Sequence, residues 1–478
     1  MKTIRVMLFV LFFPFVGHAK IELPSIIADN MVLQQQSNVK LWGKAAPNRK
    51  VKIIPSWSNK VYEVSSDSFG KWLINIFTPK AGGPYSIRIS DGDEVVLENI
   101  LIGEVWLCSG QSNMEMPMRG FEYEAVEGAV DLIAKAKEST AIRIYSSDFD
   151  EQGAIRQSSI KPLDDCKGQW MVNSSENVAR SSAVAYFFAR YLQEVLDIPV
   201  GIVVASWGGS SVEAWMSEEA IQPFGVDLSH LSQSDKLSKP IQQKACMLYN
   251  SKIAPLTKFC IKGMIWYQGE SNRYNYKQYS NMLPAMIKDY RERWGIGNFP
   301  FYYVEIAPYN YNESDGRSAA RFREMQLGLM EKIPNSGMAV TIDLGDYNFI
   351  HPRYKEDVGK RLAYWALAKD YAKKNIGYRT PVFRSQEIVG NKIYIDFDNA
   401  QGKIHPIGKS LSSFEIAGED RVFYNADAII DVKTKRLVVW SEQVSKPVAV
   451  RYAYKDYTEA SMFDFYRLPV APFRTDNW

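Results

Sequence analysis

The chain has 478 residues, more than one ordinary domain holds, so two or three domains are expected. With 46% hydrophobic and 23% charged residues, its composition is that of an ordinary globular protein. The formal net charge of +3 is too small, and the charges are too scattered, to indicate a nucleic-acid-binding protein. The sequence leaves the oligomeric state open.

Residues 1–19 have the pattern of a secretory signal peptide. Lys2 and Arg5 precede the apolar run VMLFVLFFPFVG, and Gly17 and Ala19 place small side chains at the −3 and −1 positions of a cleavage site. The run is too short for an ordinary membrane span and contains a proline. We therefore expect an exported protein, periplasmic or extracellular, that makes no membrane contact once the signal is removed.

Export permits disulfides, but the four cysteines form no recognisable framework. Cys108, Cys166, Cys246 and Cys260 are widely and irregularly spaced, and no pair has the spacing of metal ligands. Cys108 and Cys260 lie in or beside apolar strand-like runs, where a small buried thiol is expected. The sequence predicts neither a cysteine metal site nor a catalytic cysteine, and it leaves the disulfide state open.

Residues 20–100 are predicted to form an N-terminal β-sandwich domain. Short alternating stretches such as NVKLWGKA, KVKIIP, KWLINIF and EVVLENI are separated by turn clusters such as APN and AGGP. Period-two alternation bounded by turn residues is typical of antiparallel strands, and no helical pattern interrupts it.

Residues 101–384 change to a strand–helix–strand rhythm. The strands that we predict are Glu104–Ser109, Ala141–Tyr145, Val200–Ser206, Lys262–Gln268, Pro300–Ile306 and Met338–Asp343. Helical patterns between them are clearest at residues 182–197, 279–295 and 356–374. This alternation indicates an α/β domain with a mostly parallel sheet and helices on both faces, whose sites lie at the carboxyl ends of the strands. Residues 385–478 return to β patterns such as KIYIDFD and VAVRYAY and are predicted to form a C-terminal β-rich region.

One pair of charges on a helical pattern is predicted to be structural. Arg323 and Glu324 lie between the fifth and sixth predicted strands. Charged neighbours on a helix usually face water, so we expect a solvated pair and do not count these residues in the site.

Polar residues follow four of the six predicted strands, at the edge where a site is expected. They are Ser112 after the first strand, Gly208 and Gly209 after the third, Gln268, Glu270 and Asn272 at the end of the fourth, and Asp343, Asp346, Asn348 and His351 after the sixth. From GQSN alone, a glycine turn with a serine helix cap is the alternative. Together, a hydroxyl, a glycine pair, an amide beside an acid, and a histidine indicate a hydrolase.

The histidines narrow the choice of catalytic base. A serine hydroxyl is a poor nucleophile without a base, which is usually histidine. Of the four histidines, His18 belongs to the predicted signal, His230 lies in a polar loop and His405 lies in the C-terminal β region. His351 stands where a strand of the α/β domain gives way to a helix, so we predict that it serves Ser112.

At this point the sequence resembles a known family. The segments GQSNMEM, SWGGSSVEAW, IKGMIWYQGESN and GDYNFIHPRYKEDVGKRLA, in that order, resemble the sialate O-acetylesterases of the SGNH hydrolase superfamily. The resemblance extends over nearly the whole mature chain, because the flanking β regions also look like those of the family. It implies an SGNH-type fold, with a mostly parallel sheet flanked by helices between two β regions.

The resemblance also implies roles for individual residues. Ser112 would attack the acetyl carbonyl, and His351 would take its proton and return it to the leaving sugar hydroxyl. The oxyanion would be bound by the backbone N–H groups of Ser112 and Gly209 and by the side-chain amide of Asn272. Losing one such donor typically costs roughly 100- to 1,000-fold in rate.

The sequence departs from the superfamily at the acid of the triad. Many SGNH enzymes have aspartate three residues before the histidine, where this chain has Asn348. An amide can orient the imidazole but carries no charge to stabilise the imidazolium. Glu270, Asp346, or a dyad without an acid are the alternatives, with Glu270 preferred because it lies inside a site motif.

The expected function is that of an exported serine esterase that removes O-acetyl groups from sialic acids or related glycans through an acetyl-enzyme. The amides of Gln111 and Gln268 are expected to contact this acetylated carbohydrate. No metal and no cofactor is expected, since the three mature histidines are widely dispersed. An acetylxylan esterase of the same chemistry and a non-catalytic carbohydrate-binding protein are the alternatives.

Overall fold

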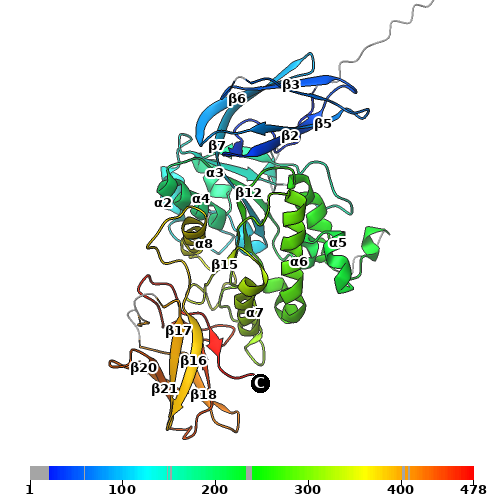
Figure 1. Ribbon diagram of the computed structural model, residues 1–478. Helices are drawn as coiled ribbons and strands as arrows, with labels where there is room; N and C mark the ends of the chain where they lie inside the picture. Colours follow the sequence, from blue (N-terminus) through cyan, green and yellow to red (C-terminus); the bar gives the residue numbers. More distant parts are fainter. Residues whose placement is uncertain are drawn as a thin grey trace, which may run out of the picture.

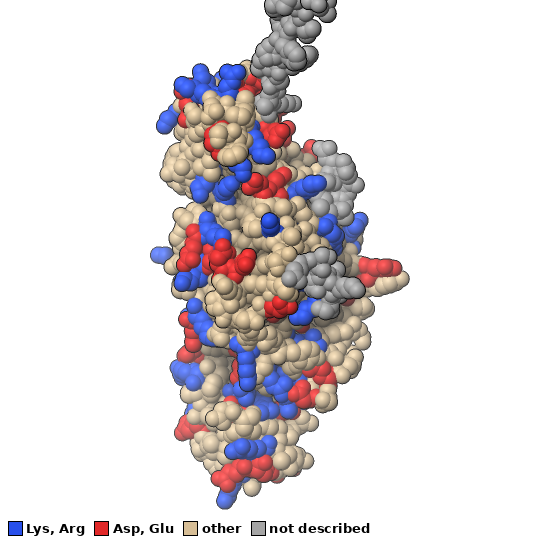
Figure 2. Space-filling model, turned by 90° about the vertical axis from the view of Figure 1, so that its right-hand side faces the viewer, with Lys and Arg blue, Asp and Glu red and all other residues tan. Residues whose placement is uncertain are grey.

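The computed structural model describes residues 21–58, 60–147, 149–150, 153–154, 156–232, 239–400, 404–406 and 410–478. The predicted signal peptide therefore lies outside the described residues. Figure 1 shows an elongated molecule, with a β region at each end of a central α/β region, as the sequence predicts. On the face in Figure 2, Lys and Arg are interspersed with Asp and Glu. No helix among the described residues is both long and apolar enough to cross a membrane.

The α/β region is built on one mostly parallel sheet. Its strand order is β11 (Gln169–Val172), β8 (Ile142–Ser146), β12 (Val200–Ser206), β7 (Glu94–Gly110), β13 (Gly263–Tyr267), β14 (Phe301–Val304) and β15 (Ser336–Ala339). Neighbours from β8 to β15 are parallel, and β11 pairs with β8 antiparallel. All six predicted strands are present. The edge strand β11 was not predicted, because its four residues, QWMV, are too short to show alternation.

Helices cover both faces of this sheet, as predicted. On one face, α4 (Ala183–Leu196) packs against α8 (Lys355–Lys369), and on the other α6 (Tyr276–Trp294) packs against α7 (Ser318–Lys332). Successive residues of β7 point to opposite faces, so Trp106 packs edge-on against Phe188 of α4, with ring centroids 5.0 Å apart.

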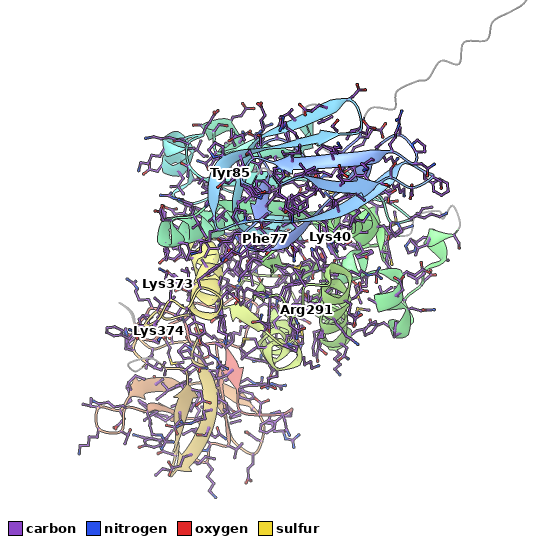
Figure 3. The ribbon with its side chains drawn as sticks, turned by 45° about the horizontal axis from the view of Figure 1, so that its top comes forward. Lys40, Phe77, Tyr85, Arg291, Lys373 and Lys374 are labelled. Atoms are coloured by element: carbon purple, nitrogen blue, oxygen red, sulfur yellow. The ribbon has the colours of Figure 1, made fainter. Side chains whose placement is uncertain are left out.

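The N-terminal region is a sandwich of two small sheets. One is the antiparallel pair β2 (Asn38–Lys44) and β5 (Lys71–Phe77); the other joins β3 (Lys50–Pro55), β4 (Tyr62–Ser65), β6 (Gly82–Ser90) and β7, with β1 (Val32–Gln34) parallel to β7. Alternate residues of these strands are buried in a shared core. Figure 3 shows Lys40 of β2 on the side toward the α/β region, where its charge lies near the thiol of Cys260.

The strand β7 crosses the boundary that we predicted at residues 100 and 101. The sequence suggested two strands, whereas the chain continues as one strand of 17 residues from the sandwich into the central sheet. Gly103 lies at the crossing, where a side chain would place its Cβ 2.0 Å from the carbonyl oxygen of Pro199. The glycine therefore marks a close backbone approach and not a turn.

The C-terminal region consists of two antiparallel four-stranded sheets. They are β16 (Val382–Val389), β17 (Lys392–Asp398), β21 (Leu437–Trp440) and β20 (Asp427–Ile430), and β19 (Phe423–Asn425), β18 (Phe414–Ala417), β22 (Ala449–Tyr452) and β23 (Phe473–Arg474).

Helix α7 holds this region through the two charges that we expected to be solvated, and that expectation was wrong. Arg323 is 1% exposed and donates to the carbonyl oxygens of Lys455 and Asp456. Glu324 accepts from the Tyr454 hydroxyl at 2.6 Å and from Arg474 Nε at 2.9 Å. The sequence shows a helical position but not which surface will cover it.

Candidate active site

Ser112 lies at the carboxyl edge of the sheet, just after the end of strand β7. At its last residue, Gly110, φ is +146°, and a Cβ would lie 2.1 Å from the carbonyl oxygen of Tyr267 in β13. The next N–H, of Gln111, donates to that same oxygen at 3.0 Å. The chain then enters the short helix α1 (Ser112–Glu115). The polar GQSN cluster is thus the turn from a buried strand into a helix, with Ser112 as the first helical residue.

His351 is held by a carboxylate that the sequence analysis did not identify. Its Nδ1 lies 2.6 Å from Oε2 of Glu124. The imidazole also meets the Phe121 ring edge-on, with centroids 5.1 Å apart. Both side chains of this pair are mostly buried, with exposures of 17% and 15%. The structure describes no hydrogen bond between Ser112 Oγ and His351 Nε2, and such bonds are often long before substrate binds.

The two carboxylates predicted to orient His351 have other partners, which corrects that expectation. Asp346 Oδ1 accepts from the backbone N–H groups of Asn348 at 2.9 Å and Phe349 at 3.2 Å, so it shapes the turn before the histidine. Glu270 Oε1 accepts from the side-chain amide of Asn113 at 2.6 Å. Asp346 was a candidate for the orienting acid because it is close to His351 in the sequence, and Glu270 was preferred because it lies in a site motif. Neither carboxylate is hydrogen-bonded to Nδ1 of His351.

Glu124 escaped the sequence analysis because it does not follow a strand. It lies between α1 and α2 (Ala129–Lys135), in the segment GFEYEAVEG. A prediction based on the polar residues that follow strands therefore does not include Glu124. The available signal was weak: an acidic residue in the loop that follows the predicted nucleophile.

A buried network ties the predicted nucleophile to the loop of the predicted base. The side-chain amide of Asn113 donates to Glu270 Oε1 and, at 3.1 Å, to the carbonyl oxygen of Ile350, which precedes the histidine. Its oxygen accepts from Lys355 Nζ. One amide therefore joins the start of α1, the end of β13 and the start of α8.

Burial shifts the two ionisable groups of this network toward neutrality. Removal from water raises the pKa of Glu270, against the lowering effect of hydrogen bonds from its own backbone N–H and from Asn113. The same effect lowers the pKa of Lys355 from 10.5 to about 7, although Glu270 and Glu124 favour its charge. Both side chains lie deep in the protein, and Lys355 is 0% exposed.

The predicted oxyanion donors differ in their availability. Among the described residues, the backbone N–H groups of Ser112 and Gly209 have no hydrogen-bond acceptor. Gly209 has φ of +69°, and a Cβ on its neighbour Gly208 would lie 3.4 Å from the Cβ of Ser112. The glycine pair therefore lies beside the hydroxyl. The amide of Asn272 already donates to Glu213 Oε2 at 2.9 Å, which leaves it one further hydrogen.

The two amides predicted to contact substrate make internal hydrogen bonds. Gln111 is 3% exposed, and its Oε1 accepts from the backbone N–H groups of Gly269 at 3.2 Å and Ser271 at 3.4 Å. Gln268 is 0% exposed and donates to the Ser210 carbonyl oxygen and to Asn272 Oδ1. These bonds hold the loops of the site together, and substrate contact by either amide stays a prediction.

The cysteines take no part in the hydrogen bonds described for this site, and no metal-ligand cluster is found among the described residues. Cys108, Cys246 and Cys260 are free thiols, and burial raises the pKa of Cys246 to about 12. Within the part of the chain that the structure describes, no three His, Cys, Asp or Glu side chains are grouped so that they could hold a metal ion.

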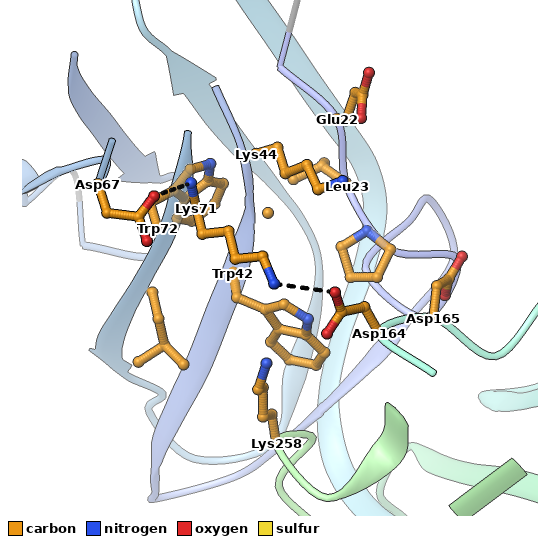
Figure 4. A pocket seen from close by; sticks show the side chains of 13 residues that line it. Glu22, Leu23, Trp42, Lys44, Asp67, Lys71, Trp72, Asp164, Asp165 and Lys258 are labelled. Atoms are coloured by element: carbon orange, nitrogen blue, oxygen red, sulfur yellow. Dashed lines mark hydrogen bonds and ion pairs between the residues drawn. The ribbon is translucent and has the colours of Figure 1, made fainter. Parts of the chain in front are cut away.

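A cavity at the opposite end of the sheet is separate from the site. It has a volume of about 400 Å³ and lies between the sandwich, which contributes Trp42 and Lys71, and the α/β region, which contributes Asp164 and Lys258 (Figure 4). Lys71 Nζ and Asp164 Oδ2 are 3.1 Å apart across it. The cavity lies before the amino end of β13, whereas Ser112 lies beyond the carboxyl end of β7.

The chain is similar in sequence and in fold to known carbohydrate esterases. The sequence model of the family described as "Carbohydrate esterase, sialic acid-specific acetylesterase" matches residues 102–368. The sialate O-acetylesterase of Homo sapiens is 29% identical over 499 residues, which cover 94% of this chain and 91% of that protein. The enzyme of Mus musculus is 27% identical over 514 residues, with 94% and 93% covered. The crystal structure of a carbohydrate acetylesterase from Xanthomonas citri has a TM-score of 0.85 at 33% identity, covering 96% of this chain and 100% of that one.

Proposed function

The chain belongs to the sialic acid-specific acetylesterase family of carbohydrate esterases, and we propose that it hydrolyses O-acetyl esters of sialic acids or related glycans through an acetyl-enzyme. The observation that carries the proposal is the carboxylate–imidazole pair of Glu124 and His351, joined through Asn113 to the turn that presents Ser112. A nucleophile, a base and an orienting acid are the parts that acyl transfer requires.

In the proposed reaction, His351 Nε2 takes the proton of the Ser112 hydroxyl as its oxygen attacks the acetyl carbonyl. Glu124 holds Nδ1, so that Nε2 faces the hydroxyl, and its negative charge stabilises the imidazolium. The backbone N–H groups of Ser112 and Gly209, with the Asn272 amide, bind the oxyanion. His351 then protonates the leaving sugar oxygen, and a water molecule, activated by the same imidazole, releases acetate.

The test is acetate release from O-acetylated sialic acid, acetylated xylan and p-nitrophenyl acetate by the wild-type chain and Ser112→Ala. The variant should lose activity by several decades while its thermal stability hardly changes, because a half-exposed hydroxyl contributes little packing. Ser229→Ala, at an exposed serine that begins the short 3-10 helix Ser229–Leu231, is the control and should retain activity.

Retention of more than about a tenth of the rate by Ser112→Ala would exclude it as the nucleophile. A wild-type chain at background on all three esters would favour the carbohydrate-binding alternative, and activity on xylan alone would favour a plant polysaccharide substrate.

Export is part of the proposal and is supported by the charged, apolar and small-residue segments of residues 1–19. Expression of the full chain in a bacterial host, followed by N-terminal sequencing of the periplasmic or secreted protein, should give a chain that begins at Lys20. Recovery of protein that still begins at Met1 and remains in the cytoplasm would contradict export.

A further inference from the structure

A cavity of about 490 Å³ is lined by close neighbours of both proposed catalytic side chains, although neither Ser112 nor His351 itself lines it. It touches the last residue of α1, one turn after Ser112, and the phenyl ring that packs edge-on against His351. Its charged and aromatic lining is Glu115, Arg119, Phe121, Glu122, Arg156 and Arg180. Three guanidinium groups against two carboxylates leave an excess of one positive charge beside the site of ester cleavage.

Backbone pairing brings two of these arginines together. The N–H of Arg119 donates to the carbonyl oxygen of Ala179 at 2.8 Å, and the N–H of Met118 donates to that of Ser181 at the same distance. Arg119 therefore lies beside the end of α3 (Ser175–Arg180), which carries Arg180. Two like charges held on adjacent backbones repel each other unless an anion lies between them.

Neither of these arginines is fully neutralised within the described protein. Arg119 is exposed and has no ion-pair or hydrogen-bond partner for its guanidinium. One terminal nitrogen of Arg180 donates to Asn177 Oδ1 at 3.0 Å and lies 3.1 Å from Glu176, whose side chain is 80% exposed and so binds weakly. The Nε of Arg180 is buried without an acceptor. The third arginine, Arg156, differs because it is paired with Glu115.

We propose that Arg119 and Arg180 bind the carboxylate of an acidic acetylated sugar and so select acidic over neutral sugars. Guanidinium groups match a carboxylate with parallel N–H donors. The cavity would hold that carboxylate beside Glu115 of α1 and Phe121, which are close neighbours of Ser112 and His351. Sialic acids carry such a carboxylate, and the acetylated xylose units of xylan do not. The inference rests on the proposed esterase function and assigns the residues that determine its specificity.

The test compares an O-acetylated sialic acid with its carboxyl methyl ester, which removes only the negative charge. The measured quantity is the ratio of kcat/KM for the acid to that for the methyl ester. Hydrogen bonds to charged groups support a preference of about 10- to 100-fold in the wild type, expressed mainly in KM. Arg119→Met combined with Arg180→Met should bring the ratio close to 1. Arg190→Met, which breaks a similar helical pair with Glu194 outside the cavity, should keep the wild-type ratio.

An unchanged ratio in the double variant would overturn the proposal, and Arg119→Met alone, at an exposed position, tests it if the double variant does not fold. Calorimetric titration with free N-acetylneuraminate separates this proposal from the proposed function, because binding requires no turnover. Suppose that the wild-type chain cleaves no ester but binds sialate, and that Arg119→Met loses this binding. The protein then has the carboxylate site without esterase activity. Equal binding by wild type and variant overturns the site itself.

Discussion

At the scale of single residues, the site depends on which carboxylate reaches which partner. Three acidic residues lie near His351, and each has a different environment. Glu124 pairs with the imidazole, Asp346 binds backbone N–H groups of its own turn, and Glu270 accepts from Asn113. The charge that stabilises an imidazolium must contact it, so Glu124 is the one positioned for this role.

Glu124→Gln should therefore lower kcat by several decades while the fold is retained. Glutamine keeps a hydrogen-bonding group of the same size but removes the charge, a change comparable to the roughly 10⁴-fold loss when a serine protease's aspartate becomes an amide. Steady-state hydrolysis of p-nitrophenyl acetate measures the effect. Glu270→Gln and Asp346→Asn serve as controls and should each cost about tenfold or less. A larger loss in either control than in Glu124→Gln would transfer the orienting role to that residue.

Lys355 gives the stability of the protein a specific pH dependence. Its pKa is about 7 in the folded protein and 10.5 when exposed to water. Between these values the unfolded chain holds a proton that the folded chain has lost, so this residue makes stability rise with pH across the window. Below about pH 7 both states are protonated, and the full cost of burying the charge is present.

Lys355→Met removes this contribution. Denaturant unfolding of both proteins at pH 6.5, 8 and 9.5 measures the change. The free energy of unfolding of the variant minus that of the wild type should be largest at pH 6.5. It should fall by up to about 1.4 kcal/mol per pH unit as the pH rises above 7. A difference that does not vary with pH would show that Lys355 keeps an ordinary pKa in the folded protein.

At the scale of elements, β7 joins the sandwich to the site and ends at the residue that permits the turn. Gly110 adopts a backbone conformation that favours glycine, and its missing side chain lets the chain pass beside Tyr267 in β13. The turn that presents Ser112 therefore depends on a close contact between two neighbouring strands.

Gly110→Ala should both destabilise the protein and impair hydrolysis. Gly92→Ala is a matched control, since Gly92 has φ of +131° but no atom within 4 Å of the position a Cβ would take. The backbone cost in the control is about 1–3 kcal/mol. Gly110→Ala should cost about 1–3 kcal/mol more from overpacking, and only this variant should lose kcat. Thermal unfolding and acetate release measure the two effects. Equal melting temperatures for the two variants would show that β13 moves aside without strain.

At the scale of the whole molecule, the two β regions stand in different relations to the site. The N-terminal sandwich lies at the amino ends of the sheet strands, away from Ser112. The C-terminal region reaches the loop that carries His351, because Tyr457 packs edge-on against Tyr347 with centroids 5.1 Å apart. Buried Arg323 fastens the same C-terminal segment to α7. The C-terminal region is therefore placed to support the His351 loop.

Local sequence patterns predicted most of the architecture and gave the chain positions of the proposed nucleophile and base. Alternation, helical periodicity and turn residues are local properties, and they predicted six sheet strands, three long helices and both β regions. The predicted strand ends also led to Ser112 and His351, because the carboxyl edge of a parallel sheet collects the residues that follow its strands.

The contacts between loops that are far apart in the sequence depend on the tertiary structure and could not be predicted. His351 pairs with a carboxylate 227 positions away in the sequence, and Arg323 is buried by a segment more than 130 positions away. The predicted break between two strands became the continuous β7. In each case the local sequence gives the chemical type of a residue and predicts the helix, strand or loop to which it belongs. Its partner is set by where a distant segment packs, and long-range packing leaves no periodic signal in one sequence.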